Sequence, residues 1–292
     1  MTDFDIKYGQ YQEIFEDYLA KFCSKLDCKP DILKDSLLYS LQLGGKRIRP
    51  VLMLSMADLL GLDYSKVLNY ALALELIHTY SLIHDDLPEM DNDDFRRGKP
   101  SNHKVFGVGN AVLAGDGLLN TAYSILFDEC FNGNTHVSAS KYICDCAGIG
   151  GMIAGQSADL LYENDCAIDE EILNFIHLNK TAKLIMAACV PPSILCDGKY
   201  YSEIVTFSRD LGLLFQLIDD VLDVEGSFES MGKSIGKDSS EGKYTAVRLY
   251  GLTECKLRAD IILDRCIKML DGVDGDTEFL KNTVYFVRHR IN

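Results

Sequence analysis

The sequence predicts an all-α fold, with roughly ten or more helices in one domain over residues 1–292. Apolar side chains recur at helical spacing along almost the whole chain. No β-rich run alternates with period two, and no Asn-Gly or Asp-Gly turn joins two such runs. Because no low-complexity linker or abrupt change of composition divides the chain, we expect a single helical bundle.

The predicted helices follow one another as apolar stripes. The first stripe comprises Tyr11, Ile14, Phe15, Tyr18, Leu19 and Phe22, and the second comprises Ile32, Leu33, Leu37, Leu38 and Leu41. Later stripes cover residues 67–87, 111–127, 172–188 and 204–224. The last is apolar nearly all round, which predicts a helix in the centre of the bundle. We expect breaks at Gly44-Gly45, Gly61, Pro100, Gly133, Pro191-Pro192, Gly198, Gly226 and Gly232.

The composition excludes several classes of protein. Lys and Arg total 29 against 44 Asp and Glu, giving a net charge of -15, whereas a general nucleic-acid binder needs a basic face. The 10 cysteines show neither redox nor zinc spacing, which is typical of reduced thiols in a cytoplasmic protein. The longest apolar stretch, residues 184–196, is shorter than the roughly 20 residues of a membrane-spanning helix, so we expect no span.

Two acidic clusters lie at the C-terminal ends of apolar helices. The first runs from His84 to Gly98 with the sequence HDDLPEMDNDDFRRG, and the second runs from Gln216 to Asp223 with the sequence QLIDDVLD. A helix C-terminus carries partial negative charge, so paired carboxylates are unfavourable there unless cations neutralise them. Carboxylates without His or Cys suit a hard ion such as magnesium, which bridges to phosphate oxygens.

The spacing within each cluster agrees with metal binding. Asp219 and Asp223 are four residues apart, so their carboxylates share one face of a helix. Pro88 can end the first helix and turn Asp91 back toward Asp85. The pair Arg96-Arg97 follows the first acidic cluster directly. Two cations next to metal ions would repel them unless anions bind there as well.

Other basic residues stand on turns and on one apolar helix. A Gly-Gly turn is followed by three cations, Lys46, Arg47 and Arg49, and Lys180-Thr181 lies within the stripe 172–188. Lys233 and Lys243 follow the second acidic cluster, each directly after a glycine. Any one of these spots alone is more typical of a solvated loop, but together they fit a phosphate-binding site.

These motifs resemble the trans-isoprenyl diphosphate synthase family, and within it the bacterial farnesyl-forming branch. The resemblance rests on GGKRIRP at 44–50, on DDLPEMDNDDFRRG at 85–98 with its long spacing, on FQLIDDVLD at 215–223, and on the later glycine–lysine pairs. The resemblance implies the isoprenoid synthase bundle of helices around a central cavity, a magnesium-dependent prenyltransferase, and a homodimer in the cytoplasm.

The resemblance also implies the role of each site residue. Three magnesium ions per site would be held by Asp85, Asp86 and Asp91 on one wall and by Asp219, with Asp220 and Asp223 in support, on the other. The allylic diphosphate would bind Arg96, Lys180, Lys233 and Lys243, and isopentenyl diphosphate would bind Lys46, Arg49, His78 and Arg97. Thr181 and Gln216 would line the cavity, where their oxygens stabilise positive charge.

The chemistry explains these residue types. Breaking the allylic carbon–oxygen bond leaves an allylic cation and a more negative diphosphate, which metal ions and fixed cations stabilise. The double bond of isopentenyl diphosphate then attacks the cation, and a proton is lost. No side-chain nucleophile is needed, in agreement with the absence of a Ser-His-Asp or Cys-His arrangement in the sequence.

The expected product is (2E,6E)-farnesyl diphosphate, made from dimethylallyl or geranyl diphosphate and isopentenyl diphosphate. Tyr80 and Ser81 precede Asp85 by about one helical turn, so a bulky Tyr80 ring would form the cavity floor. Two alternatives stay open: a geranylgeranyl or longer-chain synthase, and a non-catalytic subunit of a heteromeric synthase. A terpene cyclase is disfavoured, because the second aspartate cluster and the Gly-Gly-Lys site are both present.

Overall fold

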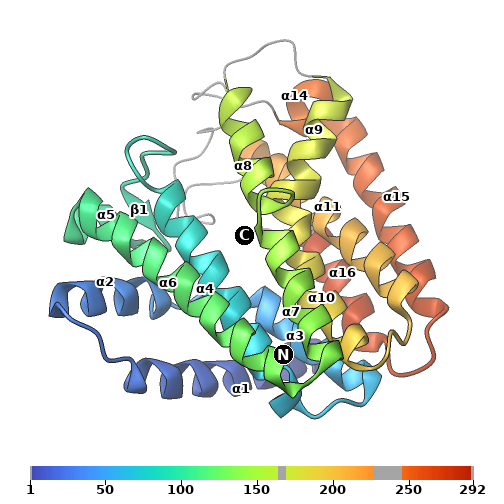
Figure 1. Cartoon of the computed structure of the whole chain (residues 1–292). Helices are drawn as coiled ribbons and strands as arrows, with labels where there is room; N and C mark the ends of the chain where they lie inside the picture. Colours follow the sequence, from blue (N-terminus) through green and yellow to red (C-terminus); the bar gives the residue numbers. More distant parts are fainter. Residues whose placement is uncertain (1, 164–168, 226–244, 291–292) are drawn as a thin grey trace.

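The computed structural model describes residues 2–163, 169–225 and 245–290, and it confirms the all-α fold (Figure 1). The α-helices of the N-terminal half are α1 (Asp3–Lys25), α2 (Asp31–Leu41), α3 (Ile48–Leu60), α4 (Leu68–Asp85), α5 (Asn102–Phe106), α6 (Val108–Glu129) and α7 (Asn134–Ala147). Those of the C-terminal half are α8 (Met152–Leu161), α9 (Glu170–Ile176), α10 (Lys183–Leu195), α11 (Tyr201–Glu225), α14 (Ala246–Tyr250), α15 (Leu252–Asp271) and α16 (Glu278–His289).

Short helices and one small hairpin complete the described chain. The short helices are the 3₁₀-helices η1 (Tyr64–Lys66) and η2 (Cys130–Asn132) and the π-helix η3 (His177–Ala182). Strands β1 (Phe95–Arg96) and β2 (Lys99–Pro100) pair antiparallel. The sequence did not predict this hairpin, because two-residue strands are too short for an alternating pattern. No described helix is long and apolar enough to cross a membrane.

The predicted apolar stripes become the faces of the bundle that pack inward. In α1 the buried residues are Tyr11, Phe15, Leu19 and Cys23, which recur every four residues. A capping box starts this helix, since Thr2 accepts from the backbone N–H of Asp5 and the Asp5 side chain accepts in return from Thr2. Helix α4 packs along α6, and α11 packs between α10 and α15 (Figure 1).

Helix α10 corrects one expectation, because it continues through Pro191 and Pro192 to Leu195. Each proline removes a backbone donor and disfavours a helix interior. Here, however, every residue from Leu184 to Ser193 is buried, and the helix packs against α3, α7 and α11. Burial of a nearly all-apolar segment on several sides therefore outweighs the local cost of the two prolines.

The turn before α3 gives Arg47 a different environment from that of Lys46, although the sequence shows them as neighbouring cations. Arg47 adopts a left-handed conformation with φ 48° and is 3% exposed. Its guanidinium donates from Nε to Glu16, from Nη1 to Glu75 and from Nη2 to the Leu41 carbonyl, each at 2.7 Å. Arg47 therefore ties α1, α2 and α4 together and contributes to the fold.

Candidate active site

The first acidic cluster begins where α4 ends. Asp85 is the last residue of the helix, and Asp86 is its C-cap. The chain then turns back as predicted, because the backbone N–H of Asp91 donates to the Asp85 carbonyl at 2.8 Å. Burial raises the pKa of Asp85 to about 6, with Asp91 adding to the rise and Lys180 opposing it. The site therefore favours cations beside Asp85.

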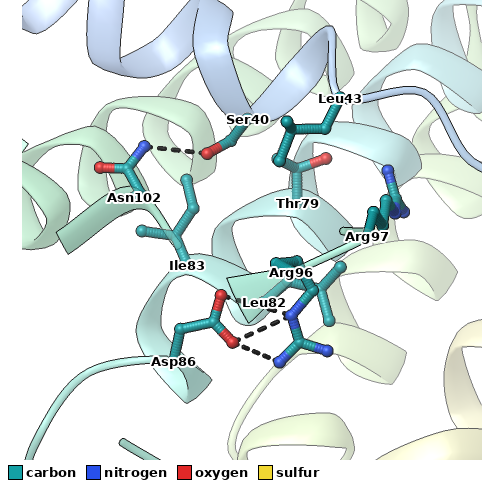
Figure 2. Close-up of a pocket in the computed structure, with 9 residues that line it drawn as sticks. All are labelled: Ser40, Leu43, Thr79, Leu82, Ile83, Asp86, Arg96, Arg97 and Asn102. Atoms are coloured by element: carbon teal, nitrogen blue, oxygen red, sulfur yellow. Dashed lines mark hydrogen bonds and ion pairs between the residues drawn. The ribbon is translucent and has the colours of Figure 1, made fainter. Parts of the chain in front are cut away.

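Asp86 is paired with Arg96, which β1 supplies (Figure 2). Arg96 Nε donates to the two Asp86 oxygens at 2.9 and 3.3 Å, and Nη2 donates to Asp86 and, at 3.3 Å, to Asp93. Burial raises the pKa of Asp86, although Arg96 opposes the rise. The small hairpin thus positions Arg96 next to the aspartates that precede it in the sequence.

A narrow pocket beside this pair is shown in Figure 2. Thr79, Leu82 and Ile83 of α4 form one side, and Arg96 and Arg97 form another. Its volume of about 20 Å³ corresponds to roughly one water molecule. The pocket is therefore too small for a prenyl chain. The residues that line it surround the Asp86–Arg96 pair.

The second acidic cluster lies near the end of α11. Asp219 accepts from Arg290 Nη2 at 2.6 Å, and the same nitrogen donates to the Phe215 carbonyl at 2.6 Å. The Arg290 guanidinium also lies 3.8 Å from the centre of the Phe215 ring. Asp220 is 3% exposed and turned into the protein, whereas Asp223 is half-buried. The three aspartates thus have different surroundings, although the motif presents them as a set.

Lys180 lies near the first acidic cluster and pairs with an aspartate of another helix. Its Nζ pairs with Asp159 of α8, a residue that the sequence analysis did not single out. Burial opposes the charge on Lys180, but Asp159, Asp85 and Asp91 outweigh burial and raise its pKa. A lysine close to the carboxylates of the first cluster can neutralise an anion that binds among them.

The π-helix η3 places Lys180 and Thr181 at this point. A Cβ atom at Gly155 of α8 would lie 2.1 Å from the backbone nitrogen of Lys180, and one at Gly212 of α11 would lie 2.4 Å from the Cα of Ala182. Only glycine allows the backbones of both helices to approach this closely. Helices α8 and α11 therefore clamp η3 from two sides, and π-turns of this kind are frequent at functional sites.

The four residues expected to bind isopentenyl diphosphate are gathered around α3 and α4. Burial lowers the pKa of His78 well below its usual value, and the nearby Arg49 and Arg97 lower it further. Burial likewise lowers the pKa of Arg49 to about 10, and its Nε is buried without a hydrogen-bond partner. Arg97 donates to the Gly44 carbonyl, and Lys46 is exposed and close to Asp219. The concentrated positive charge predicts an anion site.

Thr181 and Gln216, which were both expected to line the cavity, are in contact with each other. Thr181 Oγ1 donates to Gln216 Oε1 at 2.6 Å. Tyr80 is 6% exposed and its ring stacks edge-on against His84 at 5.7 Å, while Ser81 donates to its own helix at the His78 carbonyl. Lys233 and Lys243 lie outside the described residues.

The donor set fits magnesium. All six candidate ligands are carboxylates, and within the described residues no three Asp, Glu, His or Cys side chains form a ready-made metal cage. Magnesium is commonly held by one or two carboxylates together with water and substrate phosphates. The separate positions of the two clusters are therefore appropriate for metal ions that bind together with a diphosphate.

Sequence reasoning missed Asp159 and Arg290. Asp159 stands alone among ordinary helical residues, and Arg290 follows Arg288 and His289 directly after α16, so neither belongs to a motif that could have been recognised. Both reach the site only because α8 and the segment after α16 lie beside the acidic clusters.

The comparisons with known proteins agree with this geometry. Residues 30–281 match the sequence model of the polyprenyl synthetases. The chain belongs to the polyprenyl synthetase family. It is 41% identical over 277 residues to the farnesyl diphosphate synthase of Bacillus subtilis, with 92% of each chain covered. It is also 41% identical over 255 residues to a chloroplastic geranylgeranyl pyrophosphate synthase of Capsicum annuum, covering 85% of this chain and 68% of that protein.

The fold of this polyprenyl synthetase matches solved structures closely. A geranyltransferase from Helicobacter pylori, complexed with magnesium and isoprenyl diphosphate, superposes with a TM-score of 0.85 at 31% identity. The match covers 98% of this chain and 97% of that one. Family and relatives together support a prenyltransferase.

Proposed function

We propose that this prenyltransferase is a magnesium-dependent synthase of (2E,6E)-farnesyl diphosphate. The observation that carries the proposal is the position of Lys180, which lies beside Asp85 and Asp91 from one side while its neighbour Thr181 contacts Gln216 of α11. In the proposed site, carboxylates for metal ions and cations for phosphate would face one space from both walls.

Two diphosphates would bind at two basic regions. The allylic diphosphate would bind at Arg96, Lys180, Lys233 and Lys243, where metal ions held by Asp85, Asp86, Asp91 and Asp219 neutralise its charge. Isopentenyl diphosphate would bind at Lys46, Arg49, His78 and Arg97. The neutral His78 would donate one hydrogen bond without competing with the cations around it.

The reaction would proceed by ionisation and then condensation. The allylic carbon–oxygen bond breaks, and its electron pair leaves with the diphosphate oxygen. The electron pair of the isopentenyl double bond then forms the new carbon–carbon bond, and a proton passes to the released diphosphate. Magnesium supplies charge neutralisation for the departing diphosphate. The oxygens of Thr181 and Gln216 would face the allylic cation, and the apolar lining would exclude water.

The product length rests on Tyr80. Its ring is buried on α4, about one turn before the metal-binding end of the helix, where a growing chain would extend. Geranylgeranyl synthases are also among the relatives, so a C20 product is the alternative. A non-catalytic subunit is less consistent with the retention of all six aspartates.

We further propose a homodimer that works in the cytoplasm. Apolar side chains are exposed along α6 and η2, among them Phe127 at 66% and Phe131 at 78%, and a second copy would cover them. The cysteines among the described residues are free thiols, as expected in a reducing compartment.

The decisive experiment is incubation of the purified chain with dimethylallyl diphosphate, labelled isopentenyl diphosphate and magnesium. We expect a C15 product, and none when magnesium is chelated. Asp85→Ala and Asp219→Ala should each lower turnover by several powers of ten, because each removes a contact that stabilises developing charge. Normal turnover in either variant would contradict the role of that cluster, and a C20 product would favour the alternative.

A further inference from the structure

A partly buried chain of hydrogen bonds joins Thr181 of η3 to Gln216 and Asp220 of α11. Thr181 Oγ1 donates to Gln216 Oε1 at 2.6 Å, and Gln216 Nε2 donates to Asp220 Oδ1 at 2.9 Å. The other oxygen, Asp220 Oδ2, accepts from the backbone N–H of Ala246 at 2.7 Å and lies 3.3 Å from His177 Nε2. All the hydrogen-bonding capacity shown for this carboxylate is thus directed into the protein.

The direction of this chain follows from its buried end. An ionised carboxylate can only accept, so Gln216 must present its amide NH₂ to Asp220. The carbonyl oxygen of Gln216 must then face Thr181, and the Thr181 hydroxyl must donate its single hydrogen to that oxygen. The lone pairs of the Thr181 oxygen are not used by this chain, and in the proposed site they would face the positive charge of the allylic cation.

The same contacts join three elements. His177 and Thr181 stand near the two ends of η3, while Gln216 and Asp220 are four residues apart on one face of α11. Ala246 begins α14. The side chains of His177 and Asp220 are 10% and 4% exposed, so the contact between them is not a surface contact that solvent would weaken.

We propose that Asp220 and His177 are positioning residues, which fix the orientation of Gln216 and thereby aim the Thr181 oxygen at the allylic cation. The proposal rests on the prenyltransferase function above, and it separates Asp220 from its neighbour Asp219. Asp219 is the metal ligand of the pair, and Asp220 acts through Gln216 and Thr181.

The variant Asp220→Asn tests the direction of the chain. Its oxygen should turn toward the Ala246 N–H, with His177 Nε2 nearby, so its NH₂ faces Gln216. Gln216 must then flip, and the Thr181 hydroxyl hydrogen is pushed into the cavity. Turnover should fall about ten- to a hundredfold with the KM for each substrate unchanged, because loss of a supporting partner commonly has that size.

Metal binding provides a readout that does not depend on turnover. Thermal unfolding is followed while magnesium is titrated in the presence of inorganic diphosphate. Asp220→Asn should show the wild-type magnesium midpoint, whereas the matched variant Asp219→Asn should require more magnesium. If Asp220→Asn shifts the midpoint as far as Asp219→Asn does, Asp220 is a metal ligand and the proposal is wrong.

A double variant should restore the original direction of the hydrogen bonds between residue 220, residue 216 and Thr181. In Gln216→Glu with Asp220→Asn, the new carboxylate accepts from Asn on one side and from Thr181 on the other, and the net charge of the pair is unchanged. Turnover should exceed that of both single variants. A double variant no faster than the slower single one would overturn the orientation argument, even if the single variants are partly unfolded.

His177 has a matched control in His136, whose Nδ1 lies 3.2 Å from Glu129 in another network of the bundle. His177→Gln keeps a donor toward Asp220 and should retain turnover, whereas His177→Phe should lose about tenfold or more. His136→Phe should leave the turnover of the folded protein unchanged. Equal losses in the two Phe variants would reduce His177 to a general stabilising role. A wild-type chain without condensation activity would instead contradict the proposed function itself.

Discussion

Two arginines hold carboxylates that are expected to bind magnesium. Arg96 pairs with Asp86 and Arg290 pairs with Asp219, so each acidic cluster carries a cation supplied by the chain itself. These pairs explain how carboxylates persist at the ends of apolar helices, where the helix dipole disfavours them. Metal ions would compete with the two guanidinium groups for these carboxylate oxygens, and a diphosphate would compete with the carboxylates for the guanidinium groups.

The pH dependence of stability should depend on Asp85. Its pKa is about 6 in the folded chain and 3.8 ordinarily, so between these values the folded state binds more protons than the unfolded state. Without magnesium, stability should therefore fall as pH rises from about 4 to about 6. Asp85→Asn removes the penalty and should be more stable at pH 7 by about 3 kcal/mol, with no difference below pH 4. Denaturant unfolding in the presence of a chelator measures the stability of the wild-type chain and of Asp85→Asn at each pH. Equal stability of the two at pH 7 would contradict the raised pKa of Asp85.

The two substrate regions should be separable by mutation. Arg49→Ala and Arg97→Ala should raise the KM for isopentenyl diphosphate far more than that for the allylic substrate, and Arg96→Ala should do the reverse. A lost charge-assisted contact weakens only the diphosphate it touches, by about 1.5 to 3 kcal/mol, or roughly ten- to a hundredfold. Steady-state kinetics with each substrate varied in turn provides the measurement. Parallel changes in both KM values would argue against two regions.

The side chains of the site were predictable only where they form motifs. The aspartates and Arg49 belong to recognisable spacings, whereas Lys180 was expected only from the family resemblance; the structure brings Lys180 near the first cluster. Arg290 and Asp159 belong to no spacing, because their contacts join elements far apart in the chain. The different surroundings of Asp219 and Asp220 were equally hidden, since adjacent residues of a helix point in different directions.

At the scale of elements, periodicity predicted the long helices but not the local exceptions. The stripes 67–87, 111–127 and 204–224 correspond to α4, α6 and α11. The stripe 172–188 is divided among α9, η3 and α10. A π-turn changes the register of a helix by one residue, which leaves no clear mark in the apolar pattern.

Helix α4 should set the length of the product. Tyr80 precedes Asp85 by five residues, or about 7 Å along the helix axis. Tyr80→Ala should open the floor of the cavity and shift products toward C20 or longer, without abolishing the first condensation. Ser81→Ala is a suitable control, because the Ser81 hydroxyl donates to a carbonyl of its own helix. Chromatography of the labelled products gives the distribution, and an unchanged distribution in Tyr80→Ala would assign length control to another residue.

For the whole molecule, the exposed apolar face of α6 and η2 predicts a dimer. Replacing Phe127 and Phe131 by Glu should shift the chain toward monomers, because charge would be buried between two copies. Analytical ultracentrifugation measures the change. Leu257→Glu is the control, since Leu257 is also exposed, at 54%, but lies on α15. A monomeric wild-type chain, or a double variant that remains dimeric, would contradict this assignment.

A mutational scan of this chain could mistake the structural role of Arg47 for a role in substrate binding. Arg47 stands between two cations expected to bind substrate, so a scan scored by product alone would group all three. Removing Arg47 leaves Glu75, which is 1% exposed, without its partner, at a cost of about 3 to 5 kcal/mol. Lysine cannot replace three bonds that leave one planar group in different directions. Arg47→Lys should therefore lower the cellular abundance of the protein. Arg49→Ala should instead lower product formation while the amount of folded protein stays normal. Fluorescence-based sorting for abundance, carried out beside the product assay, would distinguish the two effects.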